Sequence, residues 1–277
     1  MRIRATVAAL SGTLALSALV VPAAQAADGP NVPKFAPFAA NAPADEVDGD
    51  TKITKVTVNG GKNIVLGTTE KKKISVAITA TDPEGIYDAD AALWHGSDVE
   101  TDIDGLIFSD EGGVTCKVVN ATTSTCTAKF TVDPKLDLYS NILAGKWKVS
   151  AYAIGNDGDY IDKDVVASTN IQRNSRLTTN ASPEPIKKGK TLTVTGALTR
   201  ANWDTSKYAG YTKQSVKLQY KKKGASSYST LKTITSDSKG NLKTTVKASA
   251  DGYYRYVFAG TSTTPAVTST SDFVDVQ

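Results

Sequence analysis

The sequence has few of the side chains that catalytic and metal centres use, because its 277 residues include one histidine and two cysteines. Any Ser–His–Asp or Cys–His catalytic arrangement would have to use His95, and no nucleophile motif such as G-x-S-x-G surrounds that residue. So few nitrogen and sulfur ligands also argue against a zinc site. No glycine-rich phosphate-binding loop follows a predicted strand. We therefore expect a non-enzymatic protein without catalytic residues.

The two cysteines, Cys116 and Cys126, are predicted to form one disulfide bond. Residues 114–119 and 124–132 have the composition of two strands around a short loop, which would place both cysteines opposite each other. Two cysteines in an exported chain most simply pair with each other. The loop that they close is short, so the expected stabilisation is about 2–3 kcal/mol.

The first 26 residues predict a secretory signal peptide. Arg2 and Arg4 precede a short apolar run, and Ala24-Gln25-Ala26 forms a small-residue cleavage site. Residues 27–50 contain four prolines and no hydrophobic periodicity, which favours a disordered tail or linker. No later apolar stretch is long enough to span a membrane. We therefore expect a secreted, extracellular protein with no membrane span in the mature chain.

The rest of the chain predicts an all-β fold of two tandem immunoglobulin-like (Ig-like) β-sandwiches. Residues 144–154 alternate with Trp147 and Val149 facing inward, and residues 250–260 alternate with Tyr254 and Tyr256 facing inward. In Ig-type sandwiches a tyrosine stands two residues before a core position and its hydroxyl returns to the backbone, a role that fits Tyr254. Seven short predicted strands separated by glycine turns follow residue 175. The expected domains are residues 51–172 and 173–277.

The two predicted domains differ in charge. Residues 51–172 hold 12 Lys against 17 Asp and Glu, a net charge of −5, and residues 173–277 hold 17 Lys and Arg against 6 Asp and Glu, a net charge of +11. Such a contrast can orient the domains or present a basic face to an acidic polymer. The favoured interpretation is simpler: solvating lysines scattered over exposed strand faces.

The second domain resembles the C-terminal Ig-like module of secreted actinomycete proteins. The resemblance lies in residues 176–200, in Tyr208-Ala-Gly-Tyr211 and in the stretches 216–220 and 238–243. Many members of that family are labelled calcium-binding proteins. The resemblance implies export and a β-sandwich, and it suggests Ca²⁺ as a possible cofactor without supplying a ligand motif.

An acidic stretch in the first domain is the first candidate for a calcium site. Glu100, Asp102 and Asp104 alternate before Gly105, and Glu111 follows at the twelfth position counted from Glu100. Ca²⁺ takes six to eight oxygen ligands, which a loop with alternating carboxylates and a glycine can supply. The first position is Glu instead of Asp and no entering helix is predicted, so we expect a loop at the sandwich rim, not an EF-hand. A solvated acidic loop is the alternative.

A second acidic stretch could form another site at the rim or add to the first. Asp157 and Asp159 follow one predicted strand, and Asp82 and Glu84 follow another. If the two strands run in the same direction, the four carboxylates lie at the same end of the sandwich. Asp-Gly-Asp alone is more often a simple turn.

An alternative function is carbohydrate or cell-wall binding by the second domain. Trp203, Tyr208 and Tyr211 cluster in a predicted loop, where exposed aromatic rings could stack on sugars, and lysines 221–223 could meet an acidic polymer. The same rings could instead fill the space beneath their own loop. We do not expect nucleic acid as a partner, because the chain is exported and contains no recognised binding motif. The partner is otherwise unknown.

Overall fold

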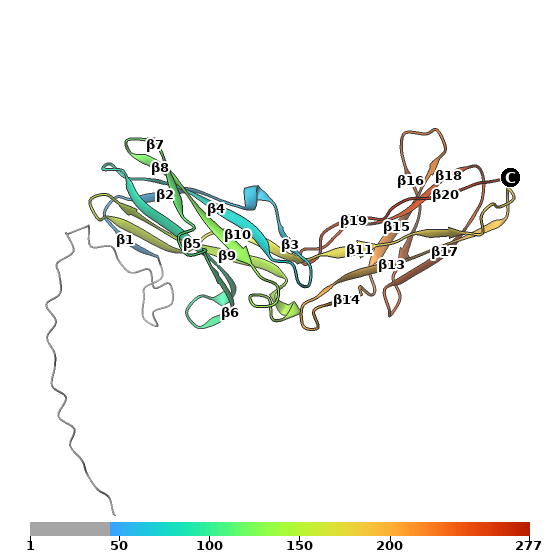
Figure 1. Cartoon of the computed structure of the whole chain (residues 1–277), viewed down its shortest axis with the longest axis horizontal. Helices are drawn as coiled ribbons and strands as arrows, with labels where there is room; N and C mark the ends of the chain where they lie inside the picture. Colours follow the sequence, from blue (N-terminus) through green and yellow to red (C-terminus); the bar gives the residue numbers. More distant parts are fainter. Residues whose placement is uncertain (1–44) are drawn as a thin grey trace, which may run out of the picture.

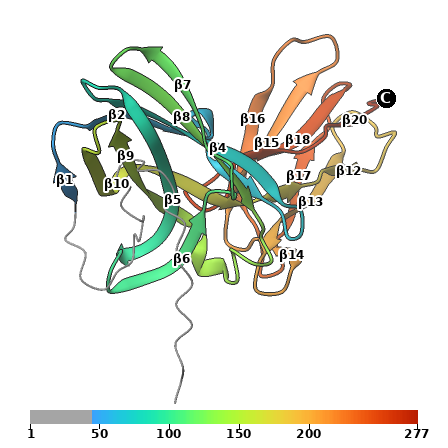
Figure 2. The same cartoon turned by 60° about the vertical axis from the view of Figure 1, so that its left-hand side comes forward.

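The computed structural model describes residues 45–277, and within them it is all-β apart from two single turns of 3₁₀ helix. The predicted signal peptide and residues 27–44 of the predicted tail lie outside the described residues. The expected fold class is confirmed. Figures 1 and 2 show two β-sandwiches joined end to end, with β1 at one end of the molecule and the C-terminus at the other.

The first sandwich consists of two sheets, which are antiparallel except for one short parallel strand. One sheet has the order β1 (Glu46–Asp48), β10 (Tyr160–Arg173), β9 (Gly145–Gly155), β5 (Ile86–Asp98) and β6 (Asp102–Phe108), and β3 (Ile64–Leu66) pairs with β10 in parallel. The other has the order β2 (Lys52–Val58), β4 (Lys72–Thr81), β8 (Thr123–Val132) and β7 (Thr115–Asn120). The 3₁₀ turns are η1 (Asn59–Gly61) and η2 (Asn141–Leu143).

The inward faces of both sheets supply the core of the first sandwich. Trp147 and Val149 of β9 are fully buried, as their alternation predicts, and the Trp147 indole donates to the backbone oxygen of Leu143 at 2.7 Å. Burying the indole N–H without a partner would cost free energy, so this bond fixes the ring's orientation. Ile78 of β4 and Phe130 of β8, from the second sheet, belong to the same buried cluster.

The disulfide between Cys116 and Cys126 is confirmed. The two residues stand opposite each other in the ladder between β7 and β8. Every residue of β7 is exposed, and β7 pairs only with β8, so this strand has little packing of its own. The disulfide therefore fastens a weakly packed edge strand to the core residue Cys126.

Two sequence predictions for the first domain are wrong in their boundaries. The acidic stretch from Glu100 to Glu111, expected to form a loop, contains the strand β6, which pairs with β5 and buries Ile107 between the sheets. The expected tail likewise contains β1, whose residue Glu46 pairs with Asp162 of β10. Both stretches are rich in carboxylates, which favours a loop. Pairing with a neighbouring strand nevertheless supplies hydrogen bonds to the backbone N–H and C=O groups, whatever the side chains are.

The second sandwich also has two sheets. One contains β11 (Ser175–Leu177), β12 (Asn180–Ser182), β13 (Thr191–Asn202), β14 (Lys207–Gly210) and β17 (Asn241–Lys247). The other contains β16 (Ser229–Thr235), β15 (Ser215–Lys222), β18 (Gly252–Phe258), β19 (Val267–Thr268) and β20 (Asp272–Val274).

The two inward tyrosines of β18 have different surroundings. Tyr256 is fully buried, and its hydroxyl donates to the backbone oxygen of Val194 in the opposite sheet at 3.0 Å. The hydroxyl that returns to the backbone before β18 comes from Tyr220 of β15, which donates to Ala250 at 2.9 Å. The role expected for Tyr254 is therefore filled by Tyr220.

The junction between the two sandwiches is short and packed. One residue, Asn174, separates the end of β10 from the start of β11, and its backbone N–H donates to Leu66 of the first sandwich at 2.8 Å. Arg173 donates from Nε to the backbone oxygen of Ala201 at 2.6 Å. Its pKa is lowered to about 10 by burial and then by the nearby Arg200.

Candidate metal centre

Five carboxylates gather at the end of the first sandwich that is farthest from the second. They come from three loops, which connect β1 to β2, β4 to β5 and β9 to β10. The loops meet because β5 begins opposite the end of β9, with Ile86 paired to Gly155. We call the five residues the rim cluster: Asp50, Asp82, Glu84, Asp157 and Asp159.

The rim cluster consists of two overlapping triads with Asp82 in common. One oxygen from each of Asp50, Asp82 and Glu84 lies within 4.8 Å of the other two, and the same holds for Asp82, Asp157 and Asp159. The expectation that the 82–84 and 157–159 stretches meet at one rim is confirmed by this geometry. The residues present could hold a metal ion with oxygen ligands.

Asp82 is the fixed centre of the rim cluster. It is 2 % exposed, and its two carboxylate oxygens accept from the Thr51 hydroxyl at 2.5 Å and from the Glu84 backbone N–H at 2.9 Å. Asp159 is held in a similar way, because it accepts from the Asp50 backbone N–H at 2.9 Å. These bonds orient both carboxylates before any ligand arrives.

Two glycines make room for the converging carboxylates. A Cβ atom on Gly155 would lie 2.4 Å from Asp82 Oδ2 and 2.7 Å from Asp157 Oδ1. A Cβ atom on Gly49, whose φ is +83°, would lie 1.7 Å from Asp159 Oδ2. Any larger side chain at either position would displace a carboxylate.

Negative charge accumulates in the rim cluster without a cationic partner. Among the described residues, none of its five carboxylates forms a salt bridge. Partial desolvation, and then the charges of Asp157, Asp82 and Asp50, raise the pKa of Glu84. Like charges at this separation repel each other, so a bound cation would relieve an existing electrostatic cost.

The structure does not bring the four residues of the first predicted calcium site together. Glu100 lies in the turn between β5 and β6, while Asp102 and Asp104 stand on β6 itself. Glu111 follows the far end of that seven-residue strand, which spans about 20 Å. One ion cannot reach both ends of an extended strand, so the expectation of a single site from all four residues is corrected.

Two of these acidic residues have local partners instead. Asp104 contacts the His95 Nδ1 atom at 2.5 Å, and Asp102 accepts from the Ser97 hydroxyl at 2.5 Å. The Ser97 hydroxyl, the nearest one to His95 in the sequence, thus donates to a carboxylate. His95 and Ser97 do not form the hydrogen-bonded pair that a serine hydrolase uses.

The predicted loop of exposed aromatic residues is wrong. Trp203 is 4 % exposed and packs into the core of the first sandwich, with its indole donating to the backbone oxygen of Gly67 at 2.9 Å. Tyr211 is 8 % exposed and belongs to the core of the second sandwich. The half-buried Tyr208 ring is covered by the Arg176 guanidinium at 3.6 Å. None of the three offers a free ring face for a sugar.

Sequence reasoning missed Asp50, because it lies in the stretch that was assigned to the tail. A signal was available in the repeated tripeptide: Asp48-Gly49-Asp50 matches Asp157-Gly158-Asp159 in spacing and composition. The two tripeptides lie next to each other in the folded domain, where Asp159 contacts Asp50.

The two-sheet sandwiches with these strand orders define the chain as a tandem Ig-like β-protein. No family model and no curated protein matches the chain. Solved structures of low similarity include a marsupial T cell receptor (12 % identity, covering 82 % of this chain and 73 % of that one, TM-score 0.40). Others are the D00–D0 domain of intimin (12 %, 79 % and 99 %, 0.25) and the amphioxus IgVJ-C2 molecule (10 %, 76 % and 99 %, 0.26). Among the described residues, no helix is long and apolar enough to cross a membrane.

Proposed function

We propose that the protein is a secreted, non-enzymatic interaction protein whose first Ig-like domain binds Ca²⁺ at the rim cluster. The observation that carries this proposal is the convergence of five carboxylates from three loops without a salt bridge among the described residues. An all-oxygen donor set is the one that Ca²⁺ prefers, and five carboxylates with backbone oxygens and water would complete six to eight ligands.

The position of the rim cluster suggests what the ion does. Asp50 lies two residues after the end of β1, and Asp159 lies directly before β10, with which β1 pairs. An ion shared between these loops would fasten the short strand β1 to the sandwich. Calcium would thereby order the segment that enters the first domain, at the end of the molecule remote from the second domain.

Two further features support the secreted interaction role. A cross-strand disulfide suits an oxidising compartment outside the cell. The resemblance of residues 176–200 to secreted actinomycete proteins labelled calcium-binding points in the same direction. Carbohydrate binding through Trp203 is not favoured, because the ring lies at the domain junction.

The test compares the melting temperature of the protein in EDTA, in millimolar Ca²⁺ and in millimolar Mg²⁺. At a hundredfold excess of ion over the dissociation constant, stabilisation is about 2.7 kcal/mol. For a domain of this size that corresponds to a rise of about 6–10 °C. The rise should occur with Ca²⁺ and not with Mg²⁺, which demands a smaller octahedral site.

Matched variants at the two acidic sites locate the ion. Asp157→Asn combined with Glu84→Gln should abolish the calcium-dependent rise, since both side chains are exposed ligands of the rim cluster. Glu100→Gln combined with Asp102→Asn changes charge equally at the other end of β5 and should leave the rise intact. No calcium-specific rise, or a rise lost only in the second pair, would refute the assignment.

A further inference from the structure

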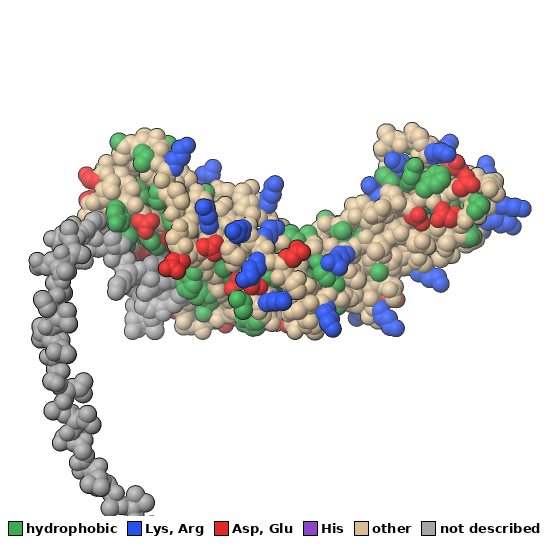
Figure 3. Space-filling view, in the orientation of Figure 1, with side chains coloured by type: hydrophobic (Ala, Val, Ile, Leu, Met, Phe, Trp, Pro, Cys, Tyr) green, Lys and Arg blue, Asp and Glu red, His purple; other side chains and the backbone are tan. Residues whose placement is uncertain are grey.

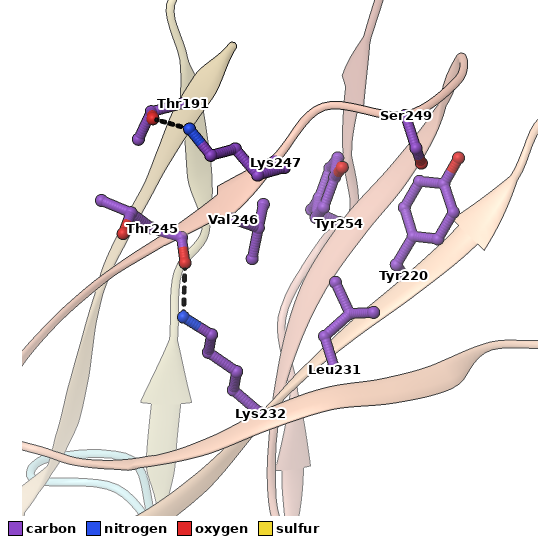
Figure 4. Close-up of a pocket in the computed structure, with 9 residues that line it drawn as sticks. All are labelled: Thr191, Tyr220, Leu231, Lys232, Thr245, Val246, Lys247, Ser249 and Tyr254. Atoms are coloured by element: carbon purple, nitrogen blue, oxygen red, sulfur yellow. Dashed lines mark hydrogen bonds between the residues drawn. The ribbon is translucent and has the colours of Figure 1, made fainter. Parts of the chain in front are cut away.

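A cavity of about 510 Å³ opens between the two sheets of the second domain (Figure 4). Thr245, Val246 and Lys247 of β17 line one side, and Tyr220, Leu231 and Tyr254 of the other sheet line the opposite side. β16 and β17 are edge strands of their sheets, so nothing in the ladders closes the gap between them. Its volume lies in the range of small-molecule sites.

The hydroxyl of a mostly buried tyrosine opens onto this cavity. Tyr254 is 1 % exposed and lines the cavity, yet its hydroxyl makes no hydrogen bond with any described residue. The neighbouring Tyr220, whose ring centroid is 4.9 Å away, donates to the backbone oxygen of Ala250. Because the Tyr254 hydroxyl opens onto the cavity and has no partner among the described residues, it is free to donate to a ligand atom placed there.

The Tyr254 hydroxyl remains a donor at any physiological pH. Burial, and then the proximity of Tyr220, raise the pKa of Tyr254 to about 12. Tyr254→Phe removes the oxygen without breaking a hydrogen bond of the free protein. That makes the residue a clean position for a test.

The walls of the cavity are mixed, with two aliphatic side chains among hydroxyl-bearing ones, and two lysines stand at its rim. Leu231, which is 42 % exposed, and Val246 supply aliphatic surface. Lys232 donates to the backbone oxygen of Thr245 at 2.6 Å, and Lys247 donates to the Thr191 hydroxyl at 3.0 Å. Each ammonium has three donors and uses one of them here, so both can still bind an anion. Figure 4 shows the tyrosine and serine hydroxyls at one side and the two ammonium groups at the other.

We propose that this cavity binds a small aryl carboxylate that carries a second polar atom. The flat body lies between the sheets against Leu231 and Val246, the carboxylate meets Lys232 and Lys247, and the second polar atom accepts from the Tyr254 hydroxyl. This site lies in the second domain and uses none of the rim cluster, so its test is independent of calcium binding.

The test titrates the full chain with 4-hydroxycinnamate and with cinnamate, which lacks the ring hydroxyl, by isothermal titration calorimetry. Tyr254→Phe should weaken 4-hydroxycinnamate about fivefold, the value of one neutral hydrogen bond, and leave cinnamate unchanged. Lys247→Gln should weaken both about fivefold or more, since it removes a charged donor. Lys243→Gln, on the same strand and outside the cavity, is the matched control and should change neither.

A variant that fills the cavity tests the proposal without relying on the loss of a hydrogen bond. Leu231→Trp places a large side chain at the exposed mouth of the cavity and should abolish binding of both compounds while the circular dichroism spectrum is retained. Absence of millimolar or tighter binding to the unmodified protein would overturn the proposal. So would binding that survives Leu231→Trp, or equal losses for both compounds in Tyr254→Phe.

Discussion

Replacing Trp203 by alanine tests how strongly the two domains depend on each other. Trp203 belongs to the chain of the second domain, but its ring is buried in the core of the first. Its backbone N–H donates to the Asn141 side chain at 2.9 Å, and Asn141 in turn donates to Asp204. Hydrogen bonds to Asp204, first that from the Asn141 backbone, lower the pKa of this carboxyl group.

The expected loss can be worked out from the buried ring. A buried tryptophan removes about 200 Å² of surface from water, which corresponds to about 5 kcal/mol at about 25 cal/mol per Å². Large-to-small substitutions of this kind cost about 3–5 kcal/mol in measured series. Because the ring fills the first domain, the loss should appear in the unfolding of the first domain, as a fall of about 10–15 °C in its melting temperature.

Differential scanning calorimetry shows whether the loss falls on the first domain, on the second domain or on neither. The unmodified protein should show strongly overlapping transitions, and Trp203→Ala should split off an early one. Trp203→Phe keeps an aromatic ring but loses the bond to Gly67, so a smaller loss of about 1–2 kcal/mol is expected. Tyr87→Ala, which removes an exposed ring of the first domain, serves as the control. If Trp203→Ala melts like the control, the ring does not couple the domains and this reasoning fails.

Two further predictions concern the first domain. Cys116→Ala combined with Cys126→Ala should lower the free energy of urea unfolding by about 2–3 kcal/mol, and dithiothreitol should then have no further effect, unlike on the unmodified protein. Burial, and then the charges of Asp164 and Glu46, raise the pKa of Asp162 to about 6, so the folded state holds a proton that the unfolded state releases near pH 4. Stability from this group therefore falls as pH rises from about 4 to 6, and Asp162→Asn should be on the order of 1–2 kcal/mol more stable at pH 7 but not at pH 3.5. Urea denaturation of both proteins at both pH values measures this. The same difference in unfolding free energy between Asp162→Asn and the unmodified protein at pH 7 and at pH 3.5 would contradict the prediction.

The charge contrast between the domains was evident from composition but did not predict a patch. On the face seen in Figure 3, Lys and Arg side chains are spread over both domains and are interspersed with Asp and Glu. Composition counts charges, whereas a patch requires that they project from the same face. The lysines of an alternating strand project outward wherever that strand lies, so their clustering depends on how the sheets are arranged.

The candidate metal site was partly predictable. The stretches around Asp82 and Asp157 follow strands that run in the same direction, and parallel orientation alone places their ends together. Hydrophobic alternation does not reveal Asp50, because the short β1–β2 segment has none of its own, and the repeated Asp-Gly-Asp tripeptide is the signal that points to it. The EF-hand-like spacing from Glu100 to Glu111 was misleading, since hydrogen bonds between β5 and β6 extend the chain instead of curling it.

Alternation of apolar and polar residues determined the all-β class, the inward faces of β9 and β18 and the partnership of the two cysteines. Each of these follows from the two-residue period of a strand and from neighbours close in sequence. Only the tertiary structure decided where the three acidic loops meet, why Trp203 belongs to the other domain's core and that Tyr254, not Tyr220, keeps a free hydroxyl. These features depend on contacts between segments far apart in the chain, whose register is fixed by packing of the whole sandwich and not by any local pattern.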